Sequence, residues 1–178
     1  VVGILEVKSS LDPKTVLNGM KKLRELEELM VDVDNIKETY KKFLPANFCC
    51  ALVFFELRKE NSKKYKCLEN MLSGSDLRGN FGAMILEGET LDVDKTGRIM
   101  FLQGDQIPTP PKARRDLLSN TYYGKTDPEV DGSYFGVSIN WNEINFPSFV
   151  FDLLAVWNGT YRMGFRSSGH GMSRINPK

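Results

Sequence analysis

The residues of this chain best suited to chemistry are a carboxylate and an ammonium, Glu6 and Lys8, two positions apart in an apolar opening segment. Residues 1–10 are typical of a β-strand, in which alternate side chains share a face. Glu6 and Lys8 are therefore predicted to lie side by side, while Leu5 and Val7 are predicted to point the other way into a core. Charged groups on an apolar strand cost free energy unless they are paired, hydrogen-bonded or bound to a metal ion. Metal-assisted phosphodiester hydrolysis is one chemistry that uses such a pair.

The elements that must position this pair follow a strand, helix, strand order. Asp12 and Pro13 predict a helix start, with Asp as the cap and Pro in the first turn. Apolar residues at three- and four-residue spacing from Val16 to Met30 give this helix one apolar face. The apolar residues 48–57 predict a second strand, and a helix that joins two strands is the building unit of a mixed or parallel sheet. The fold class is thus expected to be α/β, with a mixed central sheet flanked by helices.

Further elements are expected downstream. A short helix is predicted within 32–47, a helix over 61–72, a hairpin of strands 83–86 and 98–102, an irregular stretch over 104–132, a last strand over 134–139 and a largely buried helix over 147–157. With 178 residues and 41% hydrophobic content the chain can bury one sizeable core. We expect a single domain over 1–158, followed by a basic, Gly-rich tail over 159–178.

Charge and cysteine content limit the classes of partner and compartment. The net charge of +1 provides no general attraction for nucleic acid, so binding must come from local basic patches. The candidates are Lys21 and Lys22 on the first helix and Arg162 and Arg166 in the tail. The three cysteines cannot all pair, which favours a reducing compartment. No apolar stretch reaches the roughly 18 residues of a membrane span, so we expect a soluble, cytoplasmic protein without a membrane partner.

A known family shares the pattern at the start of the chain. Glu6-Val7-Lys8, followed by the small polar turn Ser9-Ser10 and an amphipathic helix, resembles the second half of the PD-(D/E)XK nuclease signature. In that superfamily the Glu helps to hold a divalent cation, usually magnesium, and the Lys lies near the attacking water and the scissile phosphate. The resemblance implies a restriction-endonuclease-like core in which Glu6 and Lys8 are catalytic and Glu6 binds Mg²⁺ or Mn²⁺.

The first acid of that signature is an Asp on an earlier strand, and this chain begins only five residues before Glu6. We therefore expect a core that is incomplete at its N-terminus, with an upstream segment or a partner chain supplying the Asp. A weaker resemblance, carried by residues 6–11, 48–56 and 149–154, is to an uncharacterised bacterial family of the same superfamily.

The resemblance implies a divalent-metal-dependent nuclease, with DNA favoured over RNA as the nucleic-acid partner, in bacterial defence or DNA processing. Two alternatives stay open at this point. One is a non-catalytic nucleic-acid-binding or assembly module that retains the nuclease-like fold. The other is a structural domain in which Glu6 and Lys8 simply neutralise each other. The sequence does not reveal the oligomeric state.

Overall fold

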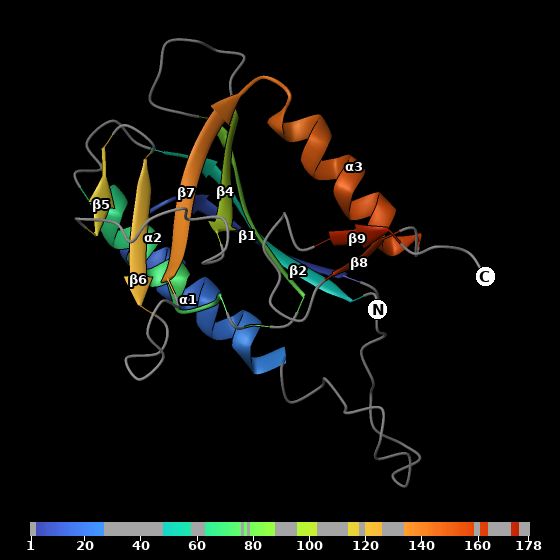
Figure 1. The fold of residues 1–178 in the computed structure, drawn as a ribbon, viewed down its shortest axis with the longest axis horizontal. Coiled ribbons are helices and arrows are strands. Elements are labelled where there is room, and N and C mark those ends of the chain that lie inside the picture. The colour runs from blue at the N-terminus through green and yellow to red at the C-terminus, as the bar shows by residue number, and fades with distance from the viewer. Residues whose placement is uncertain are drawn as a thin grey trace, which may run out of the picture.

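The structure is a computed structural model, and it describes residues 3–26, 48–57, 63–75, 77, 79–87, 96–102, 114–117, 120–125, 134–158, 161–163 and 172–174. Its main strands are β1 (Gly3–Ser10), β2 (Cys49–Glu56), β3 (Asn80–Glu87), β4 (Thr96–Leu102), β5 (Arg115–Asp116), β6 (Thr121–Lys125) and β7 (Tyr134–Asn142). They form one seven-stranded sheet in the order β1-β2-β3-β4-β7-β6-β5 (Figure 1). The helices are α1 (Pro13–Arg24), α2 (Lys64–Leu72) and α3 (Asn145–Trp157). The expected α/β class with a mixed sheet flanked by helices is confirmed.

Strand direction divides the sheet into two parts. β1, β2 and β3 run parallel, and the crossover between β1 and β2 contains α1. From β3 onward every neighbouring pair is antiparallel, including the predicted hairpin of β3 and β4. The strand predicted over 48–57 and the helix predicted over 61–72 are also present, as β2 and α2.

The two faces of the sheet carry separate apolar clusters because side chains alternate along each strand. In β2, Cys50, Leu52 and Phe54 belong to the larger cluster, which includes the buried residues of α1 and α2. Cys49 and Ala51 belong to the smaller cluster on the other face, with the buried residues of α3. Figure 1 shows α3 apart from α1 and α2. Both faces are therefore buried along the first four residues of β2, as expected for a central parallel strand, whereas Phe55 near its end is 56% exposed.

A bulge interrupts the pairing of β2 with β3. The register steps from Cys50 opposite Asn80 to Leu52 opposite Ala83, which leaves one extra residue in β3. Gly82 within this bulge has φ of +82°, and a Cβ there would overlap the Ile99 carbonyl oxygen. The Asn80 side chain accepts a hydrogen bond from the Gly82 N–H at 3.1 Å. Only glycine fits this backbone conformation without strain.

The expected orientation of Leu5 and Val7 is wrong. Their side chains are 38% and 51% exposed, and the face that carries Glu6 and Lys8 is the more buried one. β1 is an edge strand of the sheet, and α1 covers the charged face of β1 rather than its apolar face. The prediction failed because the strand pattern separates two faces but does not say which one a helix will cover.

Two downstream expectations also need correction. The helix over 147–157 is not largely buried: Phe149 and Leu153 face the core, but Phe151 is 72% exposed. Residues 104–132, expected to be irregular, contain β5 and β6, which extend the sheet beyond β7. The strand predicted over 134–139 is present as β7, but it is not the last strand of the chain, because two further short strands follow it. Asn120, with φ of +51°, lies just before β6. The helix predicted within 32–47 lies outside the described residues.

The C-terminal residues contribute a separate small sheet. β8 (Tyr161–Met163) and β9 (Met172–Arg174) pair antiparallel within the segment expected as a basic tail.

Candidate active site

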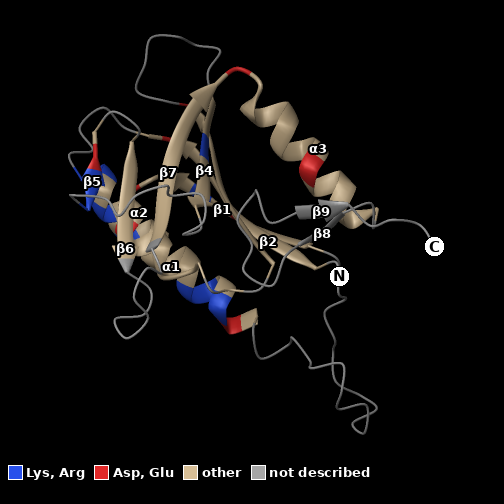
Figure 2. Ribbon diagram, in the orientation of Figure 1, with Lys and Arg blue, Asp and Glu red and all other residues tan. Residues whose placement is uncertain are grey.

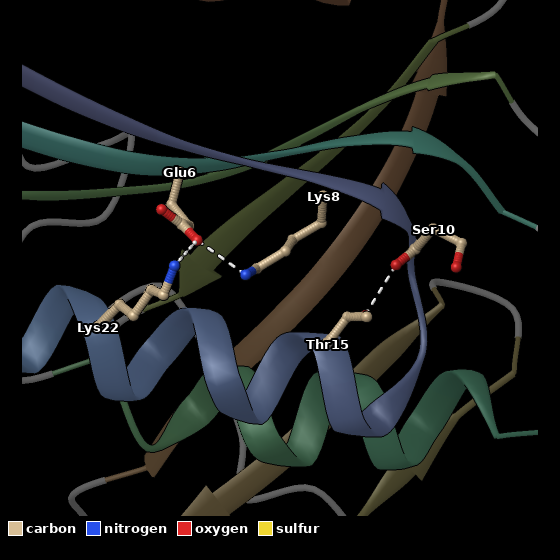
Figure 3. A network of polar contacts seen from close by, with 5 residues as sticks. All are labelled: Glu6, Lys8, Ser10, Thr15 and Lys22. Atoms are coloured by element: carbon tan, nitrogen blue, oxygen red, sulfur yellow. Dashed lines mark hydrogen bonds and ion pairs between the residues drawn. The ribbon is translucent and has the colours of Figure 1, made fainter.

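The junction between β1 and α1 is fixed by local hydrogen bonds. The Asp12 carboxylate accepts hydrogen bonds from the backbone N–H groups of Lys14 at 2.9 Å and Thr15 at 3.0 Å, and the Asp12 N–H donates to Thr15 Oγ1 at 3.2 Å. Thr15 Oγ1 also donates to the carbonyl oxygen of Ser10, the last residue of β1, at 2.7 Å (Figure 3). A reciprocal cap of this kind stabilises a helix by about 1 kcal/mol. It also fixes where α1 starts relative to the end of β1.

A glycine sets how closely α1 lies on the sheet. Gly19 is buried, and a Cβ at this position would lie 2.8 Å from the Leu52 side chain. Leu52 is the register partner of Glu6 on the neighbouring strand. Lys22 follows Gly19 by about one helical turn. The close approach at Gly19 therefore brings Lys22 within reach of Glu6.

Glu6, Lys8 and Lys22 form one polar cluster between β1 and α1 (Figure 3). The Lys8 ammonium lies 2.7 Å and the Lys22 ammonium 2.9 Å from the same oxygen, Glu6 Oε1. The side chains of Glu6 and Lys8 are 22% and 17% exposed, whereas that of Lys22 is 58% exposed. The predicted side-by-side placement of Glu6 and Lys8 is confirmed. The contact with Lys22, sixteen positions further on, was not predicted.

The two ammoniums keep Glu6 ionised. Hydrogen bonds from Lys8 and then from Lys22 lower the pKa of the Glu6 carboxyl, against a smaller opposing effect of burial. The same contact raises the pKa of Lys22, chiefly through its hydrogen bond to Glu6. The cluster carries one negative and two positive charges, so it attracts anions more strongly than cations in this arrangement.

The two sides of Glu6 within the sheet differ. On the β2 side its neighbours are Leu52 and, opposite Lys8, Phe54, both fully buried. On the other side β1 forms the edge of the sheet among the described residues, so backbone groups along this edge have no strand partner there. The β2 side of Glu6 is packed, and on the other side the structure describes no further strand.

The other carboxylates on this face lie farther along the sheet. Ser10 is in register with Glu56, and Glu56 with Glu87, so these acids stand at the ends of β2 and β3. Ser10 lies four positions beyond Glu6, about 13 Å along a strand. That distance is too long for one cation to bridge Glu6 and Glu56. In the part of the chain that the structure describes, no three His, Cys, Asp or Glu side chains are placed to hold a metal ion.

The structure describes the side chains of two of the four basic residues predicted to bind nucleic acid, Lys21 and Lys22. Lys21 and Lys22 lie in the last turn of α1, where Figure 2 shows a block of basic residues. Both side chains are exposed, and of these two only Lys22 contacts Glu6. Arg162 is on β8, of which only the backbone is described, and Arg166 lies outside the described residues. Among the described side chains of these four residues, the basic ones near Glu6 are those on α1.

Comparisons of this chain with known proteins found no relative. No family model, no curated protein and no solved structure matches the chain. Among the described residues, no helix has both the length and the apolar character needed to cross a membrane.

Proposed function

We propose that this protein is a divalent-metal-dependent nuclease that hydrolyses phosphodiester bonds, with DNA as the favoured substrate. The observation that carries the proposal is the contact between Glu6 and Lys8, 2.7 Å apart on one face of a strand that leads into a crossover helix. This arrangement is what the resemblance to PD-(D/E)XK nucleases requires of its Glu and Lys. Its three cysteines are buried and form no disulfide, which suits a reducing compartment, and we propose that the protein acts in the cytoplasm.

The residues present fit one part of a magnesium or manganese site. Both described contacts of Glu6 use Oε1, which leaves Oε2 with no hydrogen-bond partner among the described residues. Hard cations of this kind take several oxygen ligands, so a second carboxylate is required. Leu52 and Phe54 close the β2 side, and the edge of β1 is the remaining direction of approach. We propose that a strand alongside β1, from an upstream segment or a partner chain, brings the missing Asp.

Each charged residue then has a distinct role. The metal ion, when bound, would stabilise charge on the phosphate and lower the pKa of an attacking water. Glu6 would supply one carboxylate oxygen to hold it. Lys8 is held in place by Glu6 and would direct its ammonium at the phosphate or the attacking water. Lys21 on the adjacent helix turn would contact substrate phosphates and so position the strand to be cut.

Cleavage assays on the complete protein test this proposal. The assay uses linear DNA and RNA with Mg²⁺, Mn²⁺ or a chelator, and compares Glu6→Gln and Lys8→Met with the wild type. We expect metal-dependent cleavage that Glu6→Gln abolishes and that Lys8→Met slows by about 10²- to 10³-fold, the usual cost of losing a group that stabilises developing charge. Exposed charges at the two ends of α1 serve as matched controls: Lys14→Met in its first turn and Glu25→Gln at its C-cap should both cleave at the wild-type rate. Wild-type rates in both site variants would contradict the proposal.

A second candidate function is a nucleic-acid-binding or assembly module without catalysis. It is favoured by the net positive charge of the Glu6, Lys8 and Lys22 cluster, and by the lack of a three-residue metal-binding group in the described ranges. The same samples discriminate the two functions. A module of this kind would bind DNA with an affinity that falls with salt but does not change with chelator, and it would never cut.

A further inference from the structure

Helix α3 is apolar on its outer side as well as on the side that faces the sheet. Its inner residues belong to the smaller core cluster, whereas Val150, Phe151 and Leu154 are 37%, 72% and 44% exposed. Its single charged residue is Asp152, which pairs with Arg98 of β4. Figure 1 shows α3 on its own face of the sheet, with no other described helix beside it. A helix that is apolar all round is normally covered on both sides.

The same face of the sheet carries a second group of exposed apolar side chains, on β1 and β2. Leu5 and Val7 alternate with the charged residues that face α1, so they point to the face that carries α3. Phe55 points the same way, because the preceding residue, Phe54, belongs to the cluster that α1 and α2 cover. Val53 is the register partner of Val7, so Phe55 is a diagonal neighbour of Val7. Leu5, Val7 and Phe55, each between 38% and 56% exposed, therefore form one uncovered patch.

Trp157, at the C-terminal end of α3, joins these two groups. Its indole N–H donates a hydrogen bond to Cys49 Sγ at 3.1 Å, and a Cβ at Gly3 would overlap its ring. Leu5 is the next residue of β1 on the same face as Gly3. Leu154 precedes Trp157 by three positions and so lies on the same flank of the helix. The exposed side of α3 and the patch on β1 and β2 therefore border each other, and together we call them the α3–β1 surface. It consists of Leu5, Val7, Phe55, Val150, Phe151 and Leu154.

We infer that the α3–β1 surface binds a second copy of the chain, forming a two-fold dimer in which α3 of each copy lies on β1 and β2 of the other. A two-fold interface must be self-complementary. This surface meets that condition because, among the described elements, its helix lacks a covering layer and its strand patch lacks a helix. A two-fold axis between the two parts brings each into contact with its complement. The net charge of +1 gives the two copies little mutual repulsion.

The size of the α3–β1 surface suits a dimer of moderate affinity. A Phe side chain buries about 200 Å², so the exposed parts of Phe55 and Phe151 amount to about 250 Å². The four exposed aliphatic side chains raise the apolar area to about 400 Å², at about 100 Å² for each fully buried side chain. Because about two thirds of a homodimer interface is apolar, each copy would bury about 600 Å² and the pair about 1,200 Å². This total is at the lower limit of specific, stable interfaces, and we expect a Kd on the order of 10 µM.

Sedimentation velocity of the complete protein from about 1 to about 200 µM measures this association. Phe151→Asp on α3 and Phe55→Asp on β2 each place a charge in the α3–β1 surface. Each should raise Kd at least about 30-fold, the cost of losing a central interface residue. Leu117→Asp is the matched control, because Leu117 is 76% exposed beside β5, at the opposite end of the sheet. Leu117→Asp should dimerise like the wild type, and so should Phe151→Leu, which keeps an apolar side chain.

Circular dichroism checks that each variant is folded, and Phe151→Ser or Phe55→Ser replaces an aspartate variant that is not. A dimeric wild type, with folded but monomeric variants at both positions, would support the inference. A wild type that stays monomeric at about 200 µM would overturn it. Weakening by neither variant, or by only one of them, would overturn the packing of α3 on the partner's strands. Glu6 and Lys8 lie on the other face of the sheet, so none of these results bears on the nuclease proposal.

Discussion

Two ion pairs have the same distance between their charged groups, yet they lie in very different parts of the molecule. Arg98 contacts Asp152 at 2.7 Å, and Lys8 contacts Glu6 at 2.7 Å. Arg98 is on β4 inside the sheet, with a side chain only 9% exposed, and its partner is on α3. Glu6 is on the edge strand and is shared by two lysines. Two ion pairs with the same separation can therefore have very different surroundings.

The two ion pairs differ in the side chains and solvent around them. The Arg98 guanidinium lies 5.2 Å from the centre of the Phe81 ring and 5.9 Å from that of Phe149, which is favourable for a cation against aromatic faces. These contacts join α3 to the sheet and leave the Arg98 side chain only 9% exposed. Among the described residues, the Glu6 cluster lies on the end strand of the sheet, with the 58% exposed side chain of Lys22 beside it. The Arg98 pair therefore links α3 to the sheet, whereas the Glu6 cluster links the end strand β1 to α1 and is more exposed to solvent.

The largest expected effect on stability comes from breaking the buried pair. Arg98→Met removes the charge and leaves Asp152, 30% exposed, without its partner. Removing one partner of a fully buried ion pair costs about 3 to 5 kcal/mol. Because Asp152 is partly exposed and can regain some hydration, we expect a smaller loss of about 2 to 3 kcal/mol in the free energy of unfolding. Urea denaturation measures this loss. The loss of stability in the double variant Arg98→Met, Asp152→Asn should be smaller than the sum of the losses in the two single variants, because the two residues contact each other.

The same variant separates the two clusters functionally. Folded Arg98→Met protein should retain its affinity for Mn²⁺ and any cleavage activity, because Arg98 pairs with α3 while Glu6 faces α1. If Arg98→Met leaves stability within about 0.5 kcal/mol of wild type, Arg98 does not anchor α3 and the distinction between the clusters fails.

A smaller loss is expected from the aromatic side of the Arg98 site. Phe149 packs edge-on against Phe81, with ring centres 5.4 Å apart, and lies beside the Arg98 guanidinium. Phe149→Leu keeps the site apolar but removes both ring contacts, and we expect a loss of about 1 to 2 kcal/mol in the free energy of unfolding. Phe151→Leu is the matched control, because Phe151 is 72% exposed on the same helix. Equal losses in the two variants would show that the ring contacts add nothing.

These contrasts also show what could be predicted from the sequence. The order of β1, α1 and β2 was predicted because it depends on local signals: the Asp12 cap, the Pro13 start and the apolar run of residues 48–57. The pairing of Glu6 with Lys8 follows from strand alternation alone.

What could not be predicted depends on contacts between distant segments. The Lys22 contact with Glu6 spans 16 positions, and the Arg98 contact with Asp152 spans 54. Both depend on how a helix crosses the sheet, which no local pattern encodes. The orientation of Leu5 and Val7 was wrong for the same reason, since alternation gives β1 two faces but helix packing decides which one is covered.

The smallest expected effect on stability concerns Glu6 itself, and it depends on pH. Because the Lys8 and Lys22 hydrogen bonds lower the pKa of Glu6 below its ordinary value of 4.5, the ion pairs stabilise the fold above that pH. This contribution is lost as the pH falls through the lowered pKa, where the carboxyl takes up a proton. Glu6→Gln resembles the protonated side chain at every pH. The free energy of unfolding of the wild type should therefore exceed that of Glu6→Gln by less than about 1 kcal/mol at neutral pH, which is the range of a partly exposed ion pair.

Urea unfolding of wild type and Glu6→Gln, repeated from about pH 7 to about pH 3, measures this difference and cancels the titration of other carboxyls. We expect the difference to shrink toward zero at the acid end. If instead Glu6→Gln costs as much stability at neutral pH as Arg98→Met, Glu6 would be a structural residue like Arg98. Its position on the end strand of the described sheet would then not indicate a role in ligand binding. A small, pH-dependent cost combined with loss of the Mn²⁺ site would place Glu6 among residues that the fold positions for exchange with a ligand, because such residues contribute little to stability.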